Sequence, residues 1–159
     1  MYFDIQRKLD NQNYILLNLP SKVEYALLAL LEMASQSHLK HPLTVNEITA
    51  KQPIPERYLE QILATLRRGG LLKSQRGSKG GYVLAREPQD ITLLEIVSII
   101  EGNRQVKENT DLSTVEMKLI QDSWHQANQA AQSILEQYTL LDLCKQRESY
   151  LQQGLMYYI

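Results

Sequence analysis

The first half of the chain alternates apolar and polar positions at helical spacing. One segment after Ser21 has an apolar stripe suited to a core-facing helix. A second stripe of four residues, at steps of three and four, predicts another helix after Pro55, which suits its first position. A short helix, residues 45–51, fits between them. The stripes comprise Val23, Ala26, Leu27, Leu30, Leu31 and Ala34, and then Leu59, Ile62, Leu63 and Leu66.

Four helix starts carry the capping-box pattern, in which a hydroxyl residue is followed three positions later by Glu. In this pattern the hydroxyl accepts from the backbone N–H of the Glu, and the Glu carboxylate accepts from the backbone N–H of the hydroxyl residue. The capping-box pairs are Ser21 with Glu24, Thr44 with Glu47, Thr92 with Glu95, and Ser113 with Glu116. The helix that begins after Thr92 is the fourth, and it is expected over residues 93–101, ending at Gly102.

Five of the seven glycines fall within residues 69–81. Gly69 and Gly70 are expected to end the helix that follows Pro55. The segments "LLKSQR" and "YVLAR" have strand character, and "GSKGG" between them supplies the positive φ values that a tight hairpin requires. We call this predicted basic hairpin, residues 71–86, the wing.

A long helix is expected from Thr114 to Tyr138, with an apolar seam at alternating steps of four and three. Since the small preceding domain cannot cover so long a helix, the pattern favours pairing with a second chain over folding back on its own domain. A short helix, "TLLDLCKQRESYL", follows, and Gly154 is expected to separate it from an apolar tail. The dimerisation residues are Ile120, Trp124, Ala127, Ala131, Ile134 and Tyr138.

The order of elements predicts a mainly α fold with a small β-wing. Three helices followed by a hairpin form a winged helix-turn-helix, in which the third helix contacts the major groove and the wing the neighbouring minor groove. We divide the chain into an N-terminal extension (1–18), a winged helix-turn-helix domain (19–102), a linker with dimerisation helices (103–153) and a C-terminal tail (154–159). Residues 1–17 have no functional interpretation.

Charge is unevenly distributed, although the net charge is only −1. Residues 1–88 hold 12 Lys and Arg against 8 Asp and Glu, whereas residues 89–159 hold 5 against 10. A dense basic block favours a local contact with a polyanion, with a solvated surface as the alternative. Within residues 57–86 the cations are Arg57, Arg67, Arg68, Lys73, Arg76, Lys79 and Arg86, and Glu60 is the one acid.

Several classes of protein are disfavoured by what the chain lacks. It has no apolar run long enough for a membrane span and no signal-peptide pattern at its start, so a cytoplasmic protein without membrane contact is expected. It has no nucleophile–base pair, metal-ligand spacing or phosphate-binding loop. "RGSKGG" lacks the G-x-x-x-x-G-K-[ST] frame of such a loop. We therefore expect no enzyme.

The segments "SKVEYALLALLEMA" and "YLEQILATLRRGGLLKSQRGSKGGYVL", with the long helix, resemble the Rrf2 family of dimeric winged-helix transcriptional regulators. The resemblance covers nearly everything from Ser21 onwards. It implies double-stranded DNA with a palindromic operator as partner, and a homodimer. The implied DNA-binding residues are Ser21, Lys22, Arg57, Tyr58, Glu60, Gln61, Arg68, Arg76, Gly77, Ser78, Lys79 and Tyr82.

Two of these side chains have a direct chemical rationale. Gln61 suits the N6 and N7 atoms of adenine, and Glu60 can accept from cytosine N4. The alternative is that Glu60 is a surface acid that repels phosphate and Gln61 a solvated residue. In the family the residue matching Arg76 enters the minor groove. This chain departs from the family at Arg57, where small hydroxyl residues are common, so we expect its base preference to differ from that of its relatives.

Many members of the family bind an iron–sulfur cluster through three cysteines between the fourth helix and the dimer helix. Residues 102–112 contain none, and Cys144 is the one cysteine of the chain. Since cluster ligation needs several thiolates or histidines, we expect no cluster, no metal and no other cofactor. Cys144 lies among leucines, which favours a packing role over a redox sensor.

The chain also resembles a cluster-free branch of the family, the CymR-like regulators of cysteine metabolism. In that branch the regulator binds cysteine synthase, and the ending "MYYI" resembles the end of the branch. The resemblance implies a repressor whose Tyr157, Tyr158 and Ile159 enter the enzyme's active site. The alternatives are a tail packed on the dimer, a regulator sensing a small ligand in the cleft between residues 93–101 and the long helix, and a modulator of cysteine synthase that does not bind DNA.

Overall fold

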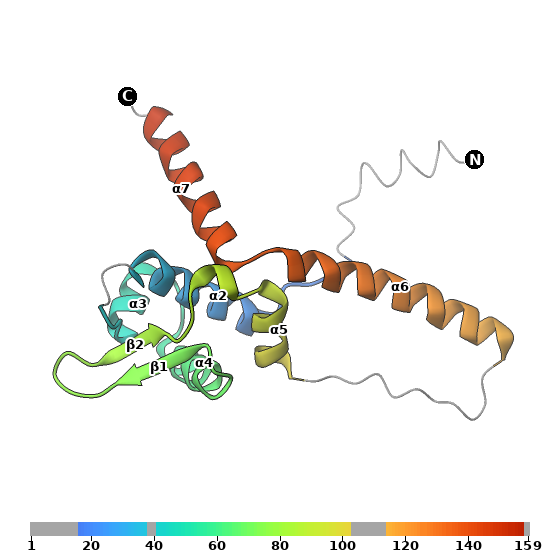
Figure 1. Ribbon diagram of the computed structural model, residues 1–159, viewed down its shortest axis with the longest axis horizontal. Coiled ribbons are helices and arrows are strands. Elements are labelled where there is room, and N and C mark those ends of the chain that lie inside the picture. The colour runs from blue at the N-terminus through green and yellow to red at the C-terminus, as the bar shows by residue number, and fades with distance from the viewer. Residues whose placement is uncertain (1–15, 38–40, 103–113, 158–159) are drawn as a thin grey trace.

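The computed structural model describes residues 16–37, 41–102 and 114–157, with only the backbone for 155–157. It has the mainly α architecture with a two-stranded antiparallel sheet that the sequence predicts (Figure 1). The elements are α2 (Ser21–Ser35), α3 (Val45–Lys51), α4 (Glu56–Arg68), β1 (Leu72–Gln75), β2 (Gly81–Leu84), the short 3-10 helix η2 (Pro88–Asp90), α5 (Leu93–Glu101), α6 (Val115–Gln137) and α7 (Leu140–Tyr157).

Helix α2 forms the centre of the domain, because α4, α5 and α7 all pack against it. Its buried surface is therefore wider than the predicted stripe and takes in Ala29 and Met33, while Leu27 and Leu31 are only half-buried. The small side chains of Ala26 and Ala29, both fully buried, let neighbouring helices approach closely. One charged residue, Glu32, is also buried in this helix.

Helix α4 buries the four residues that its pattern predicts. Leu59, Ile62, Leu63 and Leu66 join the core, and Leu71 and Leu72 continue that core into the wing. The helix ends at Arg68, where the predicted stop at Gly69 and Gly70 is confirmed. Gly70 has a φ of 82°, a conformation that few residues other than glycine adopt at low cost.

The base of the wing is hydrogen-bonded to the segment that leads into α3. Strands β1 and β2 pair with Leu72 opposite Leu84 and Gln75 opposite Gly81. Leu43 adds a bridge, because its N–H donates to the Tyr82 carbonyl at 2.9 Å and its carbonyl accepts from the Tyr82 N–H at 2.8 Å. The positive φ values expected in the hairpin occur at Gly77 (112°) and Gly81 (153°).

Two of the four predicted capping boxes differ from the structure by one residue. Helix α2 begins at Ser21 itself, because Pro20 is the N-cap and its carbonyl accepts from the Glu24 N–H at 3.0 Å. At α6 the N-cap is Thr114, whose hydroxyl accepts from the Met117 N–H. Ser113, the predicted cap, lies outside the described residues. Likewise Pro55 is the N-cap of α4 and not its first helical residue.

The other two predicted starts form at the expected residues. Thr44 and Glu47 make a complete capping box, and Thr44 lowers the pKa of the Glu47 carboxyl by donating its backbone N–H. At α5 the Thr92 hydroxyl accepts from the Glu95 N–H, but the Glu95 side chain instead forms an ion pair with Arg86. That pair joins the end of the wing to α5.

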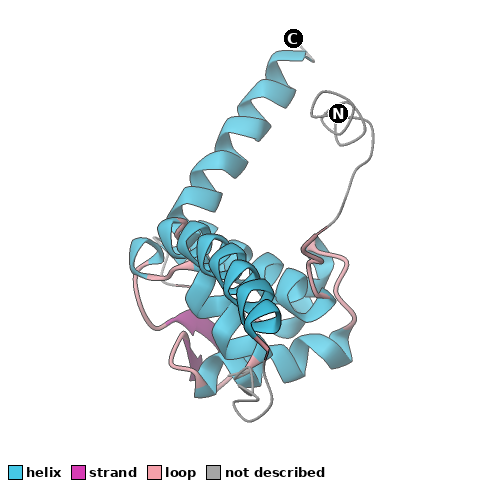
Figure 2. Cartoon of the chain, turned by 90° about the vertical axis from the view of Figure 1, so that its right-hand side faces the viewer, coloured by secondary structure: helices cyan, strands magenta, loops and turns pink. Residues whose placement is uncertain are grey.

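Helices α6 and α7 meet beside the start of α5. The Leu93 N–H donates to the Tyr138 carbonyl and the Leu140 N–H to the Ile91 carbonyl, each at 2.9 Å. Thr139 and Asp142 form a reciprocal N-cap at the start of α7, because the backbone N–H of each residue donates to the side chain of the other. From this junction α6 and α7 extend away from the domain in different directions (Figures 1 and 2). None of the described helices is long and apolar enough to cross a membrane.

Helix α7 continues through Gly154, contrary to the expectation that this glycine ends it. The helix spans 18 residues and reaches Tyr157. A glycine inside a helix costs only about 0.5–1 kcal/mol relative to alanine, and the next residues, Leu155 and Met156, favour helix formation. The C-terminal end of the described chain is therefore helical, and Tyr158 and Ile159 lie outside the described residues.

Replacing Gly81 by Ala is expected to destabilise the wing. A Cβ atom at this position would lie 2.6 Å from the Leu43 carbonyl oxygen, and the backbone φ is unfavourable for alanine. We expect a loss of about 1–3 kcal/mol in the free energy of unfolding, measured by urea denaturation. The matched control is Gly154→Ala, where a Cβ would meet no atom within 4 Å. Equal stability of the Gly81→Ala variant and the wild type would contradict the bridge to Leu43.

Candidate nucleic-acid interface

One face of α4 is buried and the opposite face carries polar side chains. Arg57, Glu60, Gln61 and Arg68 are all exposed. At 100° per residue these four positions fall within one narrow sector of the helix, away from the apolar stripe. The apolar packing of α4 therefore determines that these side chains point outward together, as a recognition helix requires.

The start of α2 is joined to the start of α4 by an aromatic contact. The ring of Tyr25 lies 6.5 Å from that of Tyr58 between centroids, and Tyr58 remains 51% exposed. Ser21 and Lys22, both exposed, precede Tyr25 by four and three residues and so share its face of α2. The contact places these two side chains beside the first turn of α4.

The wing adjoins the last turn of α4. Arg67 donates to the Ser74 hydroxyl at 3.4 Å, and Arg68 donates to the Thr65 hydroxyl at 3.3 Å. Arg67 belongs to the basic block, but Arg67, Thr65 and Ser74 are not among the DNA-binding residues that the family resemblance implies. These contacts orient the two arginines at the junction between α4 and β1, where a phosphate backbone would pass if α4 lay in the major groove.

The tip of the wing is a turn that exposes two cations. The Gly80 N–H donates to the Gly77 carbonyl at 3.0 Å, and Arg76, Gly77, Ser78 and Lys79 are all exposed. Tyr82 differs from the other predicted DNA-binding residues, because it is half-buried and packs against the core. Its ring supports the base of the wing.

All seven cations of the basic block are solvent-exposed, and among the described residues one of them forms an ion pair. Arg86 pairs with Glu95, a partner outside the block. The other six cations lie on α4 and the wing. A concentration of unneutralised positive charge on two adjacent elements suits a phosphate backbone.

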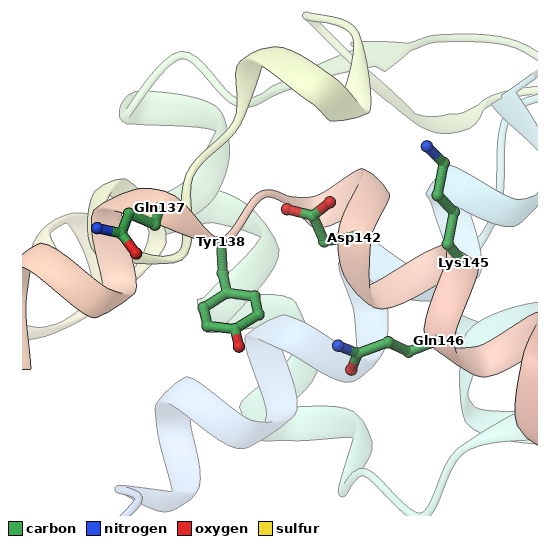
Figure 3. A pocket seen from close by; sticks show the side chains of 5 residues that line it. All are labelled: Gln137, Tyr138, Asp142, Lys145 and Gln146. Carbon is green, nitrogen blue, oxygen red and sulfur yellow. The ribbon is translucent and has the colours of Figure 1, made fainter.

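A shallow hollow of about 450 Å³ lies at the junction of α6 and α7. Figure 3 shows the side chains around it, which are Gln137, Tyr138, Asp142, Lys145 and Gln146. Its acidic group is already engaged, because the Thr139 N–H donates to the Asp142 carboxylate at 2.8 Å and lowers its pKa. We assign no ligand to this hollow.

Cys144 is half-buried and packs against the core. Burial raises the pKa of its thiol, which therefore stays protonated at neutral pH. A protonated thiol is a weak nucleophile and a poor metal ligand, in keeping with the packing role predicted for it.

A winged helix-turn-helix with a cationic outward surface defines a DNA-binding protein. A family model named Rrf2, described as an iron-dependent transcriptional regulator, matches residues 19–146. The chain belongs to the Rrf2 family. It is a transcriptional regulator and not an enzyme.

Individual relatives agree with this assignment. CymR of Bacillus subtilis is 32% identical over 146 residues, which cover 90% of this chain and 100% of that protein. A putative rrf2-like regulator of Rhodobacter capsulatus is 43% identical over 83 residues, about half of each protein. The solved structure of T. potens IscR has a TM-score of 0.73 at 34% identity, covering 91% of this chain and 98% of that one. The solved structure of Bacillus subtilis CymR has a TM-score of 0.68 at 33% identity, covering 82% and 98%.

The donor atoms of this chain do not fit an iron–sulfur cluster. A cluster needs several thiolate or imidazole ligands, whereas the chain has one cysteine, whose thiol is packed in apolar surroundings on α7. Among the described residues, no group of three or more His, Cys, Asp or Glu side chains could hold a metal ion. Within the described residues, the iron dependence in the family description therefore has no matching group of ligands.

Replacing Arg76 by Ala is expected to weaken binding to a preferred DNA duplex by about 1–3 kcal/mol, because a cation at the wing tip is lost from the groove. The measurement is a fluorescence-anisotropy titration at fixed salt. Arg86→Ala is the matched control, since that guanidinium is already paired with Glu95. It is expected to have a smaller effect. Unchanged affinity in the Arg76→Ala variant would contradict the assignment of the wing.

Proposed function

We propose that the protein is a homodimeric repressor of genes of cysteine and sulfur metabolism, that it binds a palindromic operator, and that it acts together with cysteine synthase. The DNA-binding class follows from the family. The dimer, the metabolic role and the enzyme partner are parts of the proposal, and each has its own support.

The support for a dimer is the exposed apolar seam of α6. No side chain of this 23-residue helix is buried within the described chain. Trp124 is 70% exposed, Ile120 66% and Ile134 55%. Ala127 and Ala131 between them leave room for a close approach. Such a surface on a helix that extends away from its own domain suits burial against a second copy.

A two-fold dimer would present two copies of α4 and the wing to DNA. Two such units match the two half-sites of a palindrome. In each half-site Gln61 would bond adenine, Glu60 would accept from cytosine, and Arg76 would enter the adjacent minor groove. Repression would result if the bound dimer excludes polymerase from the promoter.

Replacing Trp124 by Arg is expected to shift the protein from dimer to monomer. The change removes a large apolar contact and places a charge in the seam. The control is Gln129→Arg, on the opposite face of α6, which adds the same charge and is expected to remain dimeric. Mass would be measured by sedimentation equilibrium. A dimeric Trp124→Arg variant would show that α6 does not form the interface.

The support for a role in cysteine metabolism is similarity along nearly the whole chain to CymR, whose solved structure is described as the global cysteine regulator of Bacillus subtilis. The chain departs from the cluster-binding members through its lack of suitable cysteines. A signal other than a cluster must then control it. Protein–protein contact at the C-terminus is our candidate.

The chemistry of the C-terminus suits the active site of cysteine synthase. A terminal carboxylate resembles the α-carboxylate of an amino-acid substrate and is bound well by backbone N–H groups. Ile159 would occupy an apolar slot, with Tyr157 and Tyr158 at its rim. Because α7 is helical to Tyr157, the last residues would be presented at the end of a rigid element. Substrate and tail would then compete, so that the enzyme reports sulfur supply.

Deleting Ile159 is expected to abolish co-purification with cysteine synthase. The deletion moves the carboxylate back by one residue and removes the apolar side chain. The control is Tyr150→Ala. Tyr150 is an exposed residue of α7, seven residues before the end of that helix, and its replacement should leave the complex intact. Undiminished complex after the deletion would contradict the tail mechanism. If the wild type forms no complex with cysteine synthase, a different signal, such as a small ligand, is favoured. A steep fall of DNA affinity with salt would exclude the alternative of a modulator that does not bind DNA.

A further inference from the structure

Glu32 is a buried acid in the middle of the domain, with 1% of its surface exposed. It lies on α2, whose other buried residues are all apolar. An ionised carboxylate in such surroundings is stable only when cations and hydrogen-bond donors compensate for the lost water. The identity of those donors therefore shows which parts of the structure the carboxylate connects.

The partners of Glu32 come from two different elements. Gln52 Nε2 donates to Glu32 Oε1 at 2.7 Å, and Lys51 Nζ lies 3.9 Å from Oε2. From the other side, Arg147 Nη2 on α7 donates to Oε1 at 3.2 Å. Arg147 and Gln52 thus share one carboxylate oxygen, although they are 95 residues apart in sequence.

Lys51 and Gln52 occupy the turn that joins the two helices of the helix-turn-helix. Lys51 is the last residue of α3 and Gln52 is its C-cap. The Gln52 N–H donates to the Ile48 carbonyl at 3.0 Å, and the Ile54 N–H donates to the Gln52 carbonyl at 2.8 Å. Glu32 therefore holds the turn that sets the position of α4 relative to α3.

We propose that Arg147 is a positioning residue for DNA binding and that α7 controls the helix-turn-helix through the Arg147–Glu32–Gln52 connection. While α7 is docked, Arg147 compensates the carboxylate and the turn stays closed. When α7 moves, Glu32 loses its guanidinium partner and must recover solvation, which opens the surrounding turn. Any ligand that binds one position of α7 more tightly then changes DNA affinity, and DNA changes the affinity for that ligand by the same factor.

Two features of α7 suit it to this role. The helix is continuous from Arg147 to Tyr157, a distance of about 15 Å at 1.5 Å per residue, so its far end moves with its docked end. Figure 1 shows this end projecting from the domain on the side away from α4 and the wing. A protein bound there would leave the DNA-contacting surface free. The inference rests on DNA binding by α4 but requires no particular partner on α7.

The docking of Arg147 is incomplete. Its Nη1 atom is shielded from solvent and has no hydrogen-bond partner among the described residues. An unsatisfied donor of this kind costs free energy in the docked state.

The test compares Arg147→Met with Lys145→Met. Each change removes one cation from α7, but Lys145 is exposed and is not bonded to Glu32. The probe is a palindromic duplex selected from a random pool by the full-length wild-type protein. Affinity for it is measured at a temperature where circular dichroism shows each variant folded, and amide hydrogen exchange is followed at Gln52 and Ile54.

We expect Arg147→Met to bind the duplex roughly tenfold more weakly, within the range usual for coupled sites, and to exchange faster at Gln52 and Ile54. Lys145→Met should match the wild type in both. Unchanged affinity in Arg147→Met, or an equal loss in Lys145→Met, would overturn the proposal. A loss of affinity without faster exchange in the turn would do so as well.

A second variant covers the case in which Arg147→Met does not fold. Glu32→Gln keeps an oxygen that accepts from Gln52 but removes the charge that attracts Arg147. It should weaken binding in the same direction. Where Arg147→Met does fold, adding it to Glu32→Gln should cause little further loss, because both act through one contact. Wild-type affinity in folded Glu32→Gln, or additive losses in the double variant, would contradict the connection.

Discussion

The packing of the apolar stripe of α4 against α2 is the interaction on which the rest of the structure depends. Four side chains, Leu59, Ile62, Leu63 and Leu66, are at most 4% exposed. Burying each contributes about 1.5–3 kcal/mol relative to leaving it exposed. This packing selects one rotation of α4 about its axis. The same rotation turns Arg57, Glu60, Gln61 and Arg68 outward. The packing that stabilises the core therefore also determines which side chains form the proposed DNA-facing surface.

Helix α2 is the common support for elements that serve different purposes. The recognition helix, the helix α5 at the base of α6, and the C-terminal helix α7 all pack on it. The turn of the helix-turn-helix is held from α2 as well, through Glu32. Because these contacts converge on one helix, the winged domain is mechanically joined to both elements that extend from it. That arrangement would let so small a domain combine the DNA contact with the self-association and control that we propose.

Local signals predicted the elements well where a pattern is strong over several residues. Helices α3 and α5 have the expected bounds, α4 buries the expected stripe, and the wing has glycine at its two positive-φ positions. Boundaries failed where two neighbouring residues could each cap a helix, as with Ser113 and Thr114, or where Pro20 supplied the cap through its carbonyl. Gly154 was misjudged because a glycine within a helix is only mildly unfavourable.

The Glu32 connection was not predictable from local pattern, since its partners lie 20 and 115 residues away. A Glu at that position of α2 falls outside the predicted apolar stripe and has the pattern of a solvated residue. Only the covering of α2 by three helices makes it buried. The proposed DNA-facing residues could be selected from local sequence, because α4 and the wing are adjacent in sequence and the cations are concentrated in them.

The central claim is that two copies of the chain contact one duplex through α4 and the wing. The most direct measurement is native mass spectrometry of the full chain with a selected palindromic duplex, and with a scrambled duplex of equal length, over a series of salt concentrations. The account predicts two chains per palindrome, a clear preference over the scrambled sequence, and affinity that falls steeply with salt. One chain per duplex, or equal binding to the two sequences, would contradict it.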